Sequence, residues 1–263
     1  MPLRIATWNV NSVRQRLEHL ERFCAAYAPD VVCLQEIKVA SDSFPLEAMK
    51  DFGYPHAVVH GQKGYNGVAI LSRRRLTAPR KETWCDRDDC RHAAASVGGV
   101  ELHNFYVPAG GDIPDPEQND KFAHKLQFLT EMAAWAKKEK LAERKAVIVG
   151  DLNVAPLEHD VWNHKRLRRS VGHTPVEAEH MARLWRDGGL VDVPRHFVPE
   201  PEPLYTWWGY RFAQSVEKNY GWRLDHVLVT EPLMKRVKSL QIVRETRTWQ
   251  RPSDHVPVVL DLK

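Results

Sequence analysis

Short apolar runs recur along the chain and are separated by longer segments in which apolar residues repeat at helical spacing. A short apolar run bounded by turn-forming residues predicts a buried strand. We therefore expect strands over residues 5–9, 31–36, 57–59, 67–71, 93–97, 100–107, 146–151, 225–229, 240–244 and 256–260. The helical spacing predicts helices over residues 14–28, 122–140 and 177–188, the first ending at Pro29 and the last at Gly188-Gly189.

The order of these elements favours two packed mixed β-sheets flanked by helices, which is a four-layer α/β sandwich. Several strands come in close pairs, which indicates antiparallel hairpins, and each half of the chain contains a strand that ends in an acidic residue. A single parallel doubly wound sheet is the alternative, but the paired strands are too close in sequence for crossover helices. Because no linker rich in Gly, Ser or Pro interrupts the pattern, residues 1–263 are expected to form a single domain.

Five of the predicted strands carry an amide, carboxylate or imidazole group at one end. If these ends converge, they create an oxygen-rich pocket that contains one histidine. Such a pocket suits a hard divalent cation and a phosphate ester. The residues concerned are Asn9, Glu36, Asp151 with Asn153, Asp225, and Asp254 with His255.

Asp151 and Asn153 stand two positions apart, so in extended backbone their side chains point to the same side. A carboxylate and an amide on one face can hold and deprotonate a water molecule near a phosphate. Gly150 before them allows a ligand to approach the backbone closely. The structural alternative is an Asx turn after a strand.

Glu36 ends a run too apolar for an exposed strand, so its carboxylate needs a metal or a cationic partner such as Lys38 or Arg74. Asp254 and His255 are adjacent. A carboxylate beside an imidazole fixes its tautomer and favours its charged form, which can stabilise negative charge on a phosphodiester. A buried structural pair is the alternative.

Aromatic residues gather at 205–210 and 220–224, just before Asp225. They favour either core packing or a pocket in which rings stack on a base or a sugar. Basic runs at 73–75 and 165–169 are either solvated surface or loops that contact phosphates.

The amino-acid composition excludes some classes of protein but does not select a function. The chain has 43% apolar residues and a net charge of +4, which permits a polyanionic partner. No apolar stretch approaches the ~20 residues of a membrane span, and the N-terminus leads directly into a strand, so we expect a cytoplasmic monomer without membrane contact. Cys85, Cys90 and His92 are compatible with a zinc clip, but they lack a second ligand pair, and loop thiols are favoured.

Six blocks follow one another from near the N-terminus almost to the C-terminus: Thr7-Trp8-Asn9-Val10-Asn11, Leu34-Gln35-Glu36-Ile37-Lys38, Tyr106-Val107-Pro108, Gly150-Asp151-Leu152-Asn153, Gly221-Trp222-Arg223-Leu224-Asp225 and Ser253-Asp254-His255. Taken together, they resemble the exonuclease III family of apurinic/apyrimidinic endonucleases, within the wider endonuclease/exonuclease/phosphatase superfamily. The blocks occur in the family's order. The resemblance implies the two-sheet fold expected above.

The resemblance also implies site residues. A Mg²⁺ ion, with Mn²⁺ as a substitute, is expected at Glu36, with further ligands from Asn9, Asp151, Asn153 and Asp254. The expected catalytic residues are Tyr106, Asp151, Asn153, Asp225, Asp254 and His255. In these roles Asp151 orients or deprotonates the attacking water, and Asn153, His255 and Tyr106 contact the phosphate or the leaving oxygen. Asp225 supports the histidine, and Asp254 orients it or contacts metal.

The substrate implied by the resemblance is double-stranded DNA with abasic sites or 3′ ends. Its expected contacts are Asn11, Lys121, Trp207, Trp222 and Leu224. The implied activity is Mg²⁺-dependent cleavage 5′ to an abasic site that leaves a 3′-hydroxyl, together with 3′→5′ exonuclease and 3′-end trimming. Ala109 departs from relatives that carry an amide there, which removes one phosphate contact. The alternatives are a superfamily phosphodiesterase or phosphatase for a non-DNA ester and a catalytically silent DNA-binding module.

Overall fold

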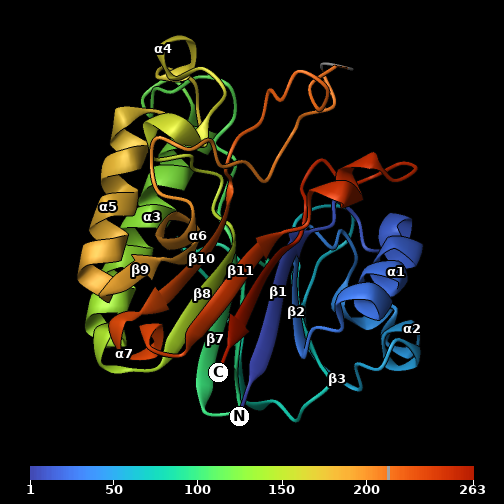
Figure 1. Ribbon diagram of the computed structural model, residues 1–263. Coiled ribbons are helices and arrows are strands. Elements are labelled where there is room, and N and C mark those ends of the chain that lie inside the picture. The colour runs from blue at the N-terminus through green and yellow to red at the C-terminus, as the bar shows by residue number, and fades with distance from the viewer. Residues whose placement is uncertain (212–213) are drawn as a thin grey trace.

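The computed structural model describes residues 1–211 and 214–263. These residues form two six-stranded mixed sheets that pack face to face, with helices on both outer faces (Figure 1). One sheet has the order β11-β12-β1-β2-β4-β3 and the other β5-β6-β7-β8-β10-β9. Each contains one parallel pair, β1 with β2 and β7 with β8. The expected four-layer sandwich is confirmed, and the doubly wound alternative is wrong.

The strands of the first sheet are β11 (Val237–Ile242), β12 (Val258–Leu262), β1 (Leu3–Asn9), β2 (Val31–Gln35), β4 (Val68–Ser72) and β3 (His56–His60). Those of the second are β5 (Thr77–Arg80), β6 (His92–Val97), β7 (Val100–Tyr106), β8 (Ala146–Asp151), β10 (Asp225–Thr230) and β9 (Leu190–Asp192). Each of the ten runs predicted from the sequence corresponds to one of these strands. The two strands that were not predicted are β5, which is mostly exposed, and β9, which has three residues.

The longer helices lie on the outer faces of the sheets. Figure 1 shows α1 (Leu17–Tyr27) and α2 (Leu46–Asp51) beside the first sheet, and α3 (Asp120–Lys138) and α5 (Pro175–Gly188) beside the second. Asn119 caps α3, and Thr174 caps α5 in a capping box with Glu177. The predicted helix over 14–28 begins as a 3₁₀ turn at Arg14–Arg16. Short segments complete the fold: α4 (His164–Leu167), α6 (Val193–Phe197), α7 (Glu231–Met234), and 3₁₀ turns at Ser41–Ser43, Leu141–Glu143, Glu158–Asp160 and Arg244–Thr248.

The strands are apolar on both faces because each sheet is covered on both sides. Val147 and Val149 of β8 join the core between the sheets, whereas Ile148 packs outward with Phe128 of α3 and Leu184 of α5. This alternation is the two-residue period of an extended strand. It explains why the sequence shows continuous apolar runs and not alternating ones.

A fully buried ion pair joins the two long helices of the second layer. Lys125 of α3 lies 2.5 Å from Glu177 of α5, and neither side chain is exposed. The Lys125 Nζ also donates a hydrogen bond to the backbone oxygen of Asn153 at 2.6 Å. The Glu177 carboxylate accepts hydrogen bonds from the backbone N–H groups of Gly172 and Thr174. The pair therefore connects both helices to loops at one end of the sheets.

Lys125→Met leaves the Glu177 carboxylate buried without its cation. Because an uncompensated buried charge is costly, we expect the free energy of unfolding to fall by about 3–5 kcal/mol. Adding Glu177→Gln to this variant should recover part of the loss. Urea unfolding measures both effects, with Lys121→Met on the exposed start of the same helix as the control. A loss below about 1 kcal/mol for Lys125→Met would contradict a structural role for the pair.

Candidate active site

The polar strand ends predicted from the sequence converge at one end of the two sheets, opposite the chain termini (Figure 1). Register causes this convergence. Asn9 of β1 pairs with Gln35 in the parallel neighbour, so Glu36 follows beside it. Tyr106 of β7 and Asp225 of β10 both pair with Asp151 of β8. Packing of the two sheets then brings these ends together, as the 2.9 Å hydrogen bond from Asn9 Nδ2 to Asp151 Oδ2 shows.

His255 lies between two carboxylates of the second sheet. Its Nδ1 is 2.9 Å from Asp225 Oδ2, and its Nε2 is 3.6 Å from Asp151 Oδ2. Asp151 and Asp225 are 1% and 0% exposed and His255 is 5% exposed. Thr206 donates its hydroxyl to Asp225 Oδ2 at 2.6 Å, which fixes that carboxylate toward the histidine.

Burial and mutual charge set the protonation of this centre. Burial alone disfavours the imidazolium, but the Asp225 and Asp151 carboxylates outweigh it and raise the pKa of His255 to about 10. Burial raises the pKa of Asp151 to about 7, although the His255 charge opposes the change. At neutral pH His255 is therefore a cation, and Asp151 is suited to accept a proton.

A third carboxylate, Asp254, connects this centre to a neighbouring tryptophan. Asn11 Nδ2 donates to its Oδ1 at 3.0 Å and Trp207 Nε1 donates to its Oδ2 at 2.9 Å. Burial opposes ionisation, yet His255 and these two donors lower the pKa of Asp254. Asn9 donates to Asp151 Oδ2 at 2.9 Å. The two asparagines thus hold two carboxylates in place.

Glu36 has one of the cationic partners considered from the sequence, and it has a second partner that was not predicted. Its Oε2 lies 2.9 Å from Lys38 Nζ, which is the cationic partner considered, and its Oε1 accepts the Tyr106 hydroxyl. Lys38 also donates to Asn11 Oδ1 at 2.6 Å. Arg74 instead pairs with Asp30 and lies outside the site. Burial and the Glu36 and Asp151 carboxylates raise the pKa of Tyr106 well above its usual value, so the phenol retains its proton.

Asp151 forms the Asx turn that was the structural alternative, since its Oδ1 accepts the Asn153 backbone N–H at 3.0 Å. The Asn153 Nδ2 donates to the Val107 oxygen at 2.9 Å and keeps a second hydrogen for another acceptor. Gly150 has a structural reason to be glycine. A Cβ there would lie 1.9 Å from the Phe105 oxygen of the neighbouring strand, and the expected approach of a ligand stays a prediction.

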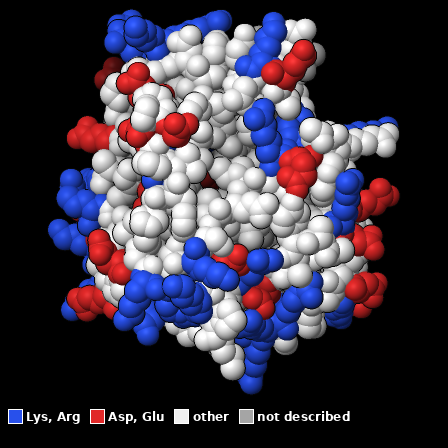
Figure 2. Space-filling model, viewed as in Figure 1, with Lys and Arg blue, Asp and Glu red and all other residues white. Residues whose placement is uncertain are grey.

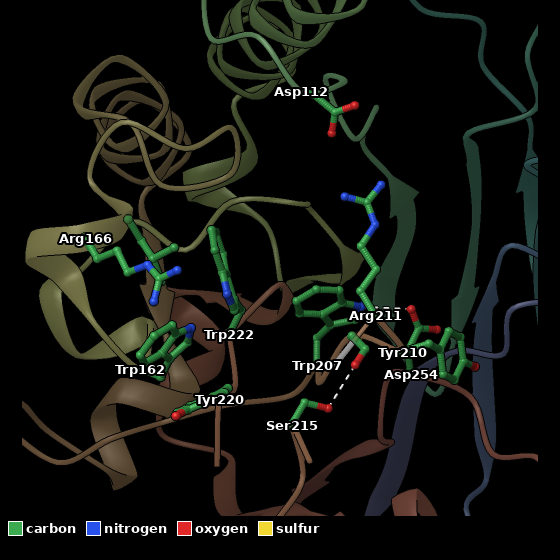
Figure 3. Close-up of a pocket in the computed structure, with 12 residues that line it drawn as sticks. Asp112, Trp162, Arg166, Trp207, Tyr210, Arg211, Ser215, Tyr220, Trp222 and Asp254 are labelled. Carbon is green, nitrogen blue, oxygen red and sulfur yellow. Dashed lines mark hydrogen bonds between the residues drawn. The ribbon is translucent and has the colours of Figure 1, made fainter. Parts of the chain in front are cut away.

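An aromatic pocket of about 600 Å³ opens beside Asp254. Trp207 and Trp222 lie on two sides of it and meet edge to face, with ring centroids 6.2 Å apart (Figure 3). Leu224 is buried and packs with both rings beneath the pocket. Trp162, which stacks with Tyr220 at 4.2 Å, extends the aromatic wall. The predicted aromatic cluster therefore serves both as packing and as a pocket wall.

Apart from Lys38 and His255, the basic groups near the site lie on its rim. Figure 2 shows a hollow in this face with basic side chains gathered above it, over α4. Arg166 of α4 reaches the pocket and stacks over Trp162 at 5.5 Å. Lys121 is exposed on the first turn of α3 and does not line the pocket. Its contact with DNA stays a prediction.

The donor set fits a divalent cation. One polar atom from each of Asp151, Asp225 and His255 lies within 4.8 Å of the others, and the two carboxylates are the donors, because the His255 imidazolium has no free lone pair. Asp225 Oδ1 is buried without a hydrogen-bond partner among the described residues, which is costly unless another group binds it. Glu36 stands beside this cluster with a partly exposed carboxylate. Asp151 and Glu36 are the anionic oxygen ligands that Mg²⁺ or Mn²⁺ would take first.

Three positioning residues were missed from the sequence. Thr206 orients Asp225, Ser253 donates to the Asn9 oxygen at 2.6 Å, and Trp8 Nε1 donates to the His255 oxygen at 3.1 Å. Thr206 stands within the aromatic cluster, and Trp8 within an apolar run. Nothing in their local pattern assigns them a role, although Trp8 and Ser253 stand in two of the six blocks that resemble the family.

The fold and the carboxylate–histidine centre define a hydrolase of phosphate esters. The sequence profile of the endonuclease/exonuclease/phosphatase family matches residues 6–255, and the chain belongs to this family. Its enzymes depend on a divalent metal. The predicted recognition of the family and the predicted phosphodiester hydrolase are confirmed.

Three individual relatives show which members of the family the chain resembles. The chain is 32% identical to exodeoxyribonuclease III of Haemophilus influenzae, over 99% of this chain and 100% of that one. An AP endonuclease from Archaeoglobus fulgidus has the same fold, with a TM-score of 0.91, 34% identity and 98% coverage of both chains. The 3′ phosphatase NExo from Neisseria, solved with a product DNA hairpin, has a TM-score of 0.91 and 34% identity, over 99% of both chains.

A buried network of charged side chains lies next to the aromatic pocket. Arg223, next to Trp222, pairs with Asp160 at 2.7 Å and Asp192 at 2.8 Å. It also lies 3.3 Å from His226 Nδ1, while His226 Nε2 is 2.8 Å from the Val154 oxygen. These partners require a neutral imidazole protonated at Nε2. Burial and the Arg223 charge lower the pKa of His226 to about 4.

This histidine makes the protein sensitive to acid. His226 is neutral when folded but takes up a proton on unfolding below pH ~6.5. Its contribution to stability is complete above that pH and is lost as the pH falls toward 4, by up to about 1.4 kcal/mol per pH unit. We expect His226→Gln, which can keep both hydrogen bonds, to lose this part of the pH dependence. Urea unfolding at pH 7 and 4.5 measures it, and equal slopes for both proteins would contradict the assignment.

Proposed function

We propose that this protein is a Mg²⁺-dependent DNA-repair nuclease that cleaves the phosphodiester 5′ to abasic sites and also removes nucleotides or blocking groups from 3′ ends. One observation carries the proposal: the buried Asp151–His255–Asp225 centre lies beside an aromatic pocket of about 600 Å³. The centre suits phosphodiester hydrolysis, and the pocket suits a sugar turned out of the helix. The nuclease, phosphatase and AP endonuclease relatives described above support it.

Glu36 and Asp151 would hold the metal, and Asn9, Asn153 and Asp254 would complete or orient its shell. Mn²⁺ would substitute for Mg²⁺ because it also prefers oxygen ligands. When bound, the ion activates the phosphate and neutralises charge that develops during in-line attack.

The protein's own groups supply proton transfer and charge stabilisation. Asp151 orients the attacking water and accepts its proton. The His255 imidazolium, held by Asp225, donates to a phosphate oxygen as negative charge develops there. Asn153 can donate its remaining Nδ2 hydrogen to another oxygen. Tyr106, which retains its proton, assists the leaving oxygen.

Trp207, Trp222 and Leu224 would recognise the abasic site by shape. A nucleotide without a base is the least costly to turn out of a duplex, because little stacking is lost. The rings admit the bare sugar and crowd out one that carries a base. Asn11, Lys121 and the basic rim over α4 would contact the DNA backbone.

We further propose a cytoplasmic monomer. All four cysteines are free thiols, which suits a reducing compartment. In the described part of the chain, no helix is long and apolar enough to cross a membrane.

The first test is cleavage of a duplex that carries one abasic site. We expect Mg²⁺-dependent incision 5′ to the site, abolished by a chelator, and a fall in kcat of at least ~10²-fold for Asp151→Asn. Binding to the duplex should change far less. Glu179→Gln on the exposed face of α5 is the control. Binding without incision would favour a silent DNA-binding module, and hydrolysis of other phosphate esters alone would favour a non-DNA substrate.

The second test separates repair from general nuclease activity. Trp222→Ala removes a pocket wall and a stacking surface worth ~1–3 kcal/mol. We expect kcat/KM on abasic DNA to fall about tenfold or more, with reduced discrimination against intact duplex. Measurement of kcat/KM on both substrates, with Tm, checks this.

Trp185→Ala on α5 is the matched control, because Trp185 packs on the outer core away from the pocket. If Trp222→Ala lowers Tm but leaves the abasic-to-intact ratio unchanged, its ring is a packing residue and the pocket does not select the substrate.

A further inference from the structure

A second group of metal-ligating side chains lies outside the nuclease centre. His60 ends β3, and Asp88 and Cys90 lie in the loop between β5 and β6. One ligand atom of each residue lies within 4.8 Å of the other two. His60 Nε2 and Asp88 Oδ1 are 3.6 Å apart. The loop is thereby brought against the end of a strand in the other sheet.

These spacings suit one tetrahedral ion. Bonds of about 2.0–2.3 Å to nitrogen, oxygen and sulfur place neighbouring ligands roughly 3.3–3.6 Å apart. The His60–Asp88 separation agrees with this value and is longer than a normal hydrogen bond. Asp88 is 80% exposed, so its side chain can move toward an ion, whereas Cys90 is buried beside His60.

The orientation of His60 points to a ligand. Its Nδ1 lies 2.8 Å from the backbone oxygen of His92. Nδ1 therefore carries the hydrogen, and the lone pair of Nε2 faces Asp88 and Cys90. A carbonyl bonded to one ring nitrogen while the other is free is the usual arrangement of a metal-binding histidine.

We propose that His60 Nε2, Asp88 and Cys90 Sγ bind Zn²⁺, with water at the fourth position. Imidazole, thiolate and carboxylate together favour this borderline-soft ion over Mg²⁺. Binding forms the S–Zn bond and releases the thiol proton to solvent. The site shares no residue with the nuclease centre.

The zinc clip considered from the sequence joined Cys90 to Cys85 and His92, and these two residues have other contacts in the structure. Cys85 Sγ lies 4.0 Å from the His124 oxygen, and His92 Nε2 lies 3.1 Å from His103 Nδ1. The histidine that faces Cys90 is His60, thirty residues earlier in the chain. Only the packing of the two sheets brings them together.

The ion would fix a loop that reaches the nuclease centre. Asn66 donates to the Asp89 oxygen at 3.1 Å, and Arg91 donates to the Tyr106 oxygen at 3.2 Å. The Arg91 guanidinium also lies 5.0 Å from the centroid of the Tyr106 ring. The proposed zinc site is therefore structural. It holds in place the loop whose Arg91 side chain contacts Tyr106.

Cobalt substitution tests the proposal on the full chain. Co²⁺ is titrated into metal-free protein in a phosphine-reduced buffer that contains excess Mg²⁺. We expect a thiolate-to-cobalt charge-transfer band that saturates at one equivalent and disappears when Zn²⁺ is added. Cys90→Ser should abolish the band, His60→Asn should weaken Co²⁺ binding at least ~10-fold, and Cys85→Ser should retain it.

Cys85 is the matched control because it is a buried thiol in the same loop that lies outside the cluster. Circular dichroism and Tm of the metal-free variants establish that each is folded. Absence of the band in the folded parent protein, its persistence in Cys90→Ser, or its loss only in Cys85→Ser would each overturn the proposal.

Discussion

The burial of three ionisable side chains at the junction of the two sheets is the constraint on which the site depends. Asp151 and Asp225 come from the second sheet, whereas His255 precedes β12 of the first. Two buried carboxylates repel each other and lose hydration, so they require a cation between them. His255 provides it only when the sheets are packed. The site therefore exists only in the assembled sandwich, and the apolar core between the sheets supplies the stability that offsets its cost.

A buried amide network fixes the relative position of the sheets directly beneath the site. Gln35 Nε2 donates to Asn104 Oδ1 at 2.7 Å, and Asn104 Nδ2 donates to the backbone oxygens of Leu34 and Ala69, each at 2.9 Å. A one-residue shift would leave these groups unpaired at a cost of about 1–3 kcal/mol each. The network thus selects the register in which Glu36, one residue after Gln35, meets Tyr106.

The apolar runs were sufficient to predict the main strands, because covered sheets need side chains buried on both faces. The same logic explains why β5, with the sequence Thr-Ala-Pro-Arg, was missed, since an exposed edge strand needs no apolar pattern. The polar ends of the runs predicted the site, but local sequence could not assign partners. Glu36 meets both the cation and the phenol, and His60 meets Cys90 through packing between sheets. Such contacts depend on long-range geometry that a periodicity does not contain.

The pocket and the centre are physically coupled through Asp254. One of its oxygens accepts a hydrogen bond from the Trp207 indole, which lines the pocket. The other accepts one from the Asn11 side chain, which in turn accepts a hydrogen bond from Lys38. Asp254 is adjacent to His255, and Trp207 pairs with His255 through the backbone. A group that moves the Trp207 ring on entering the pocket must therefore act on the Asp254 carboxylate and, through it, on the imidazolium. In this arrangement the position of the Trp207 ring and the electrostatic environment of His255 cannot vary independently. In the proposed function, a side chain that selects the sugar would also contribute to the electrostatic field at the scissile phosphate.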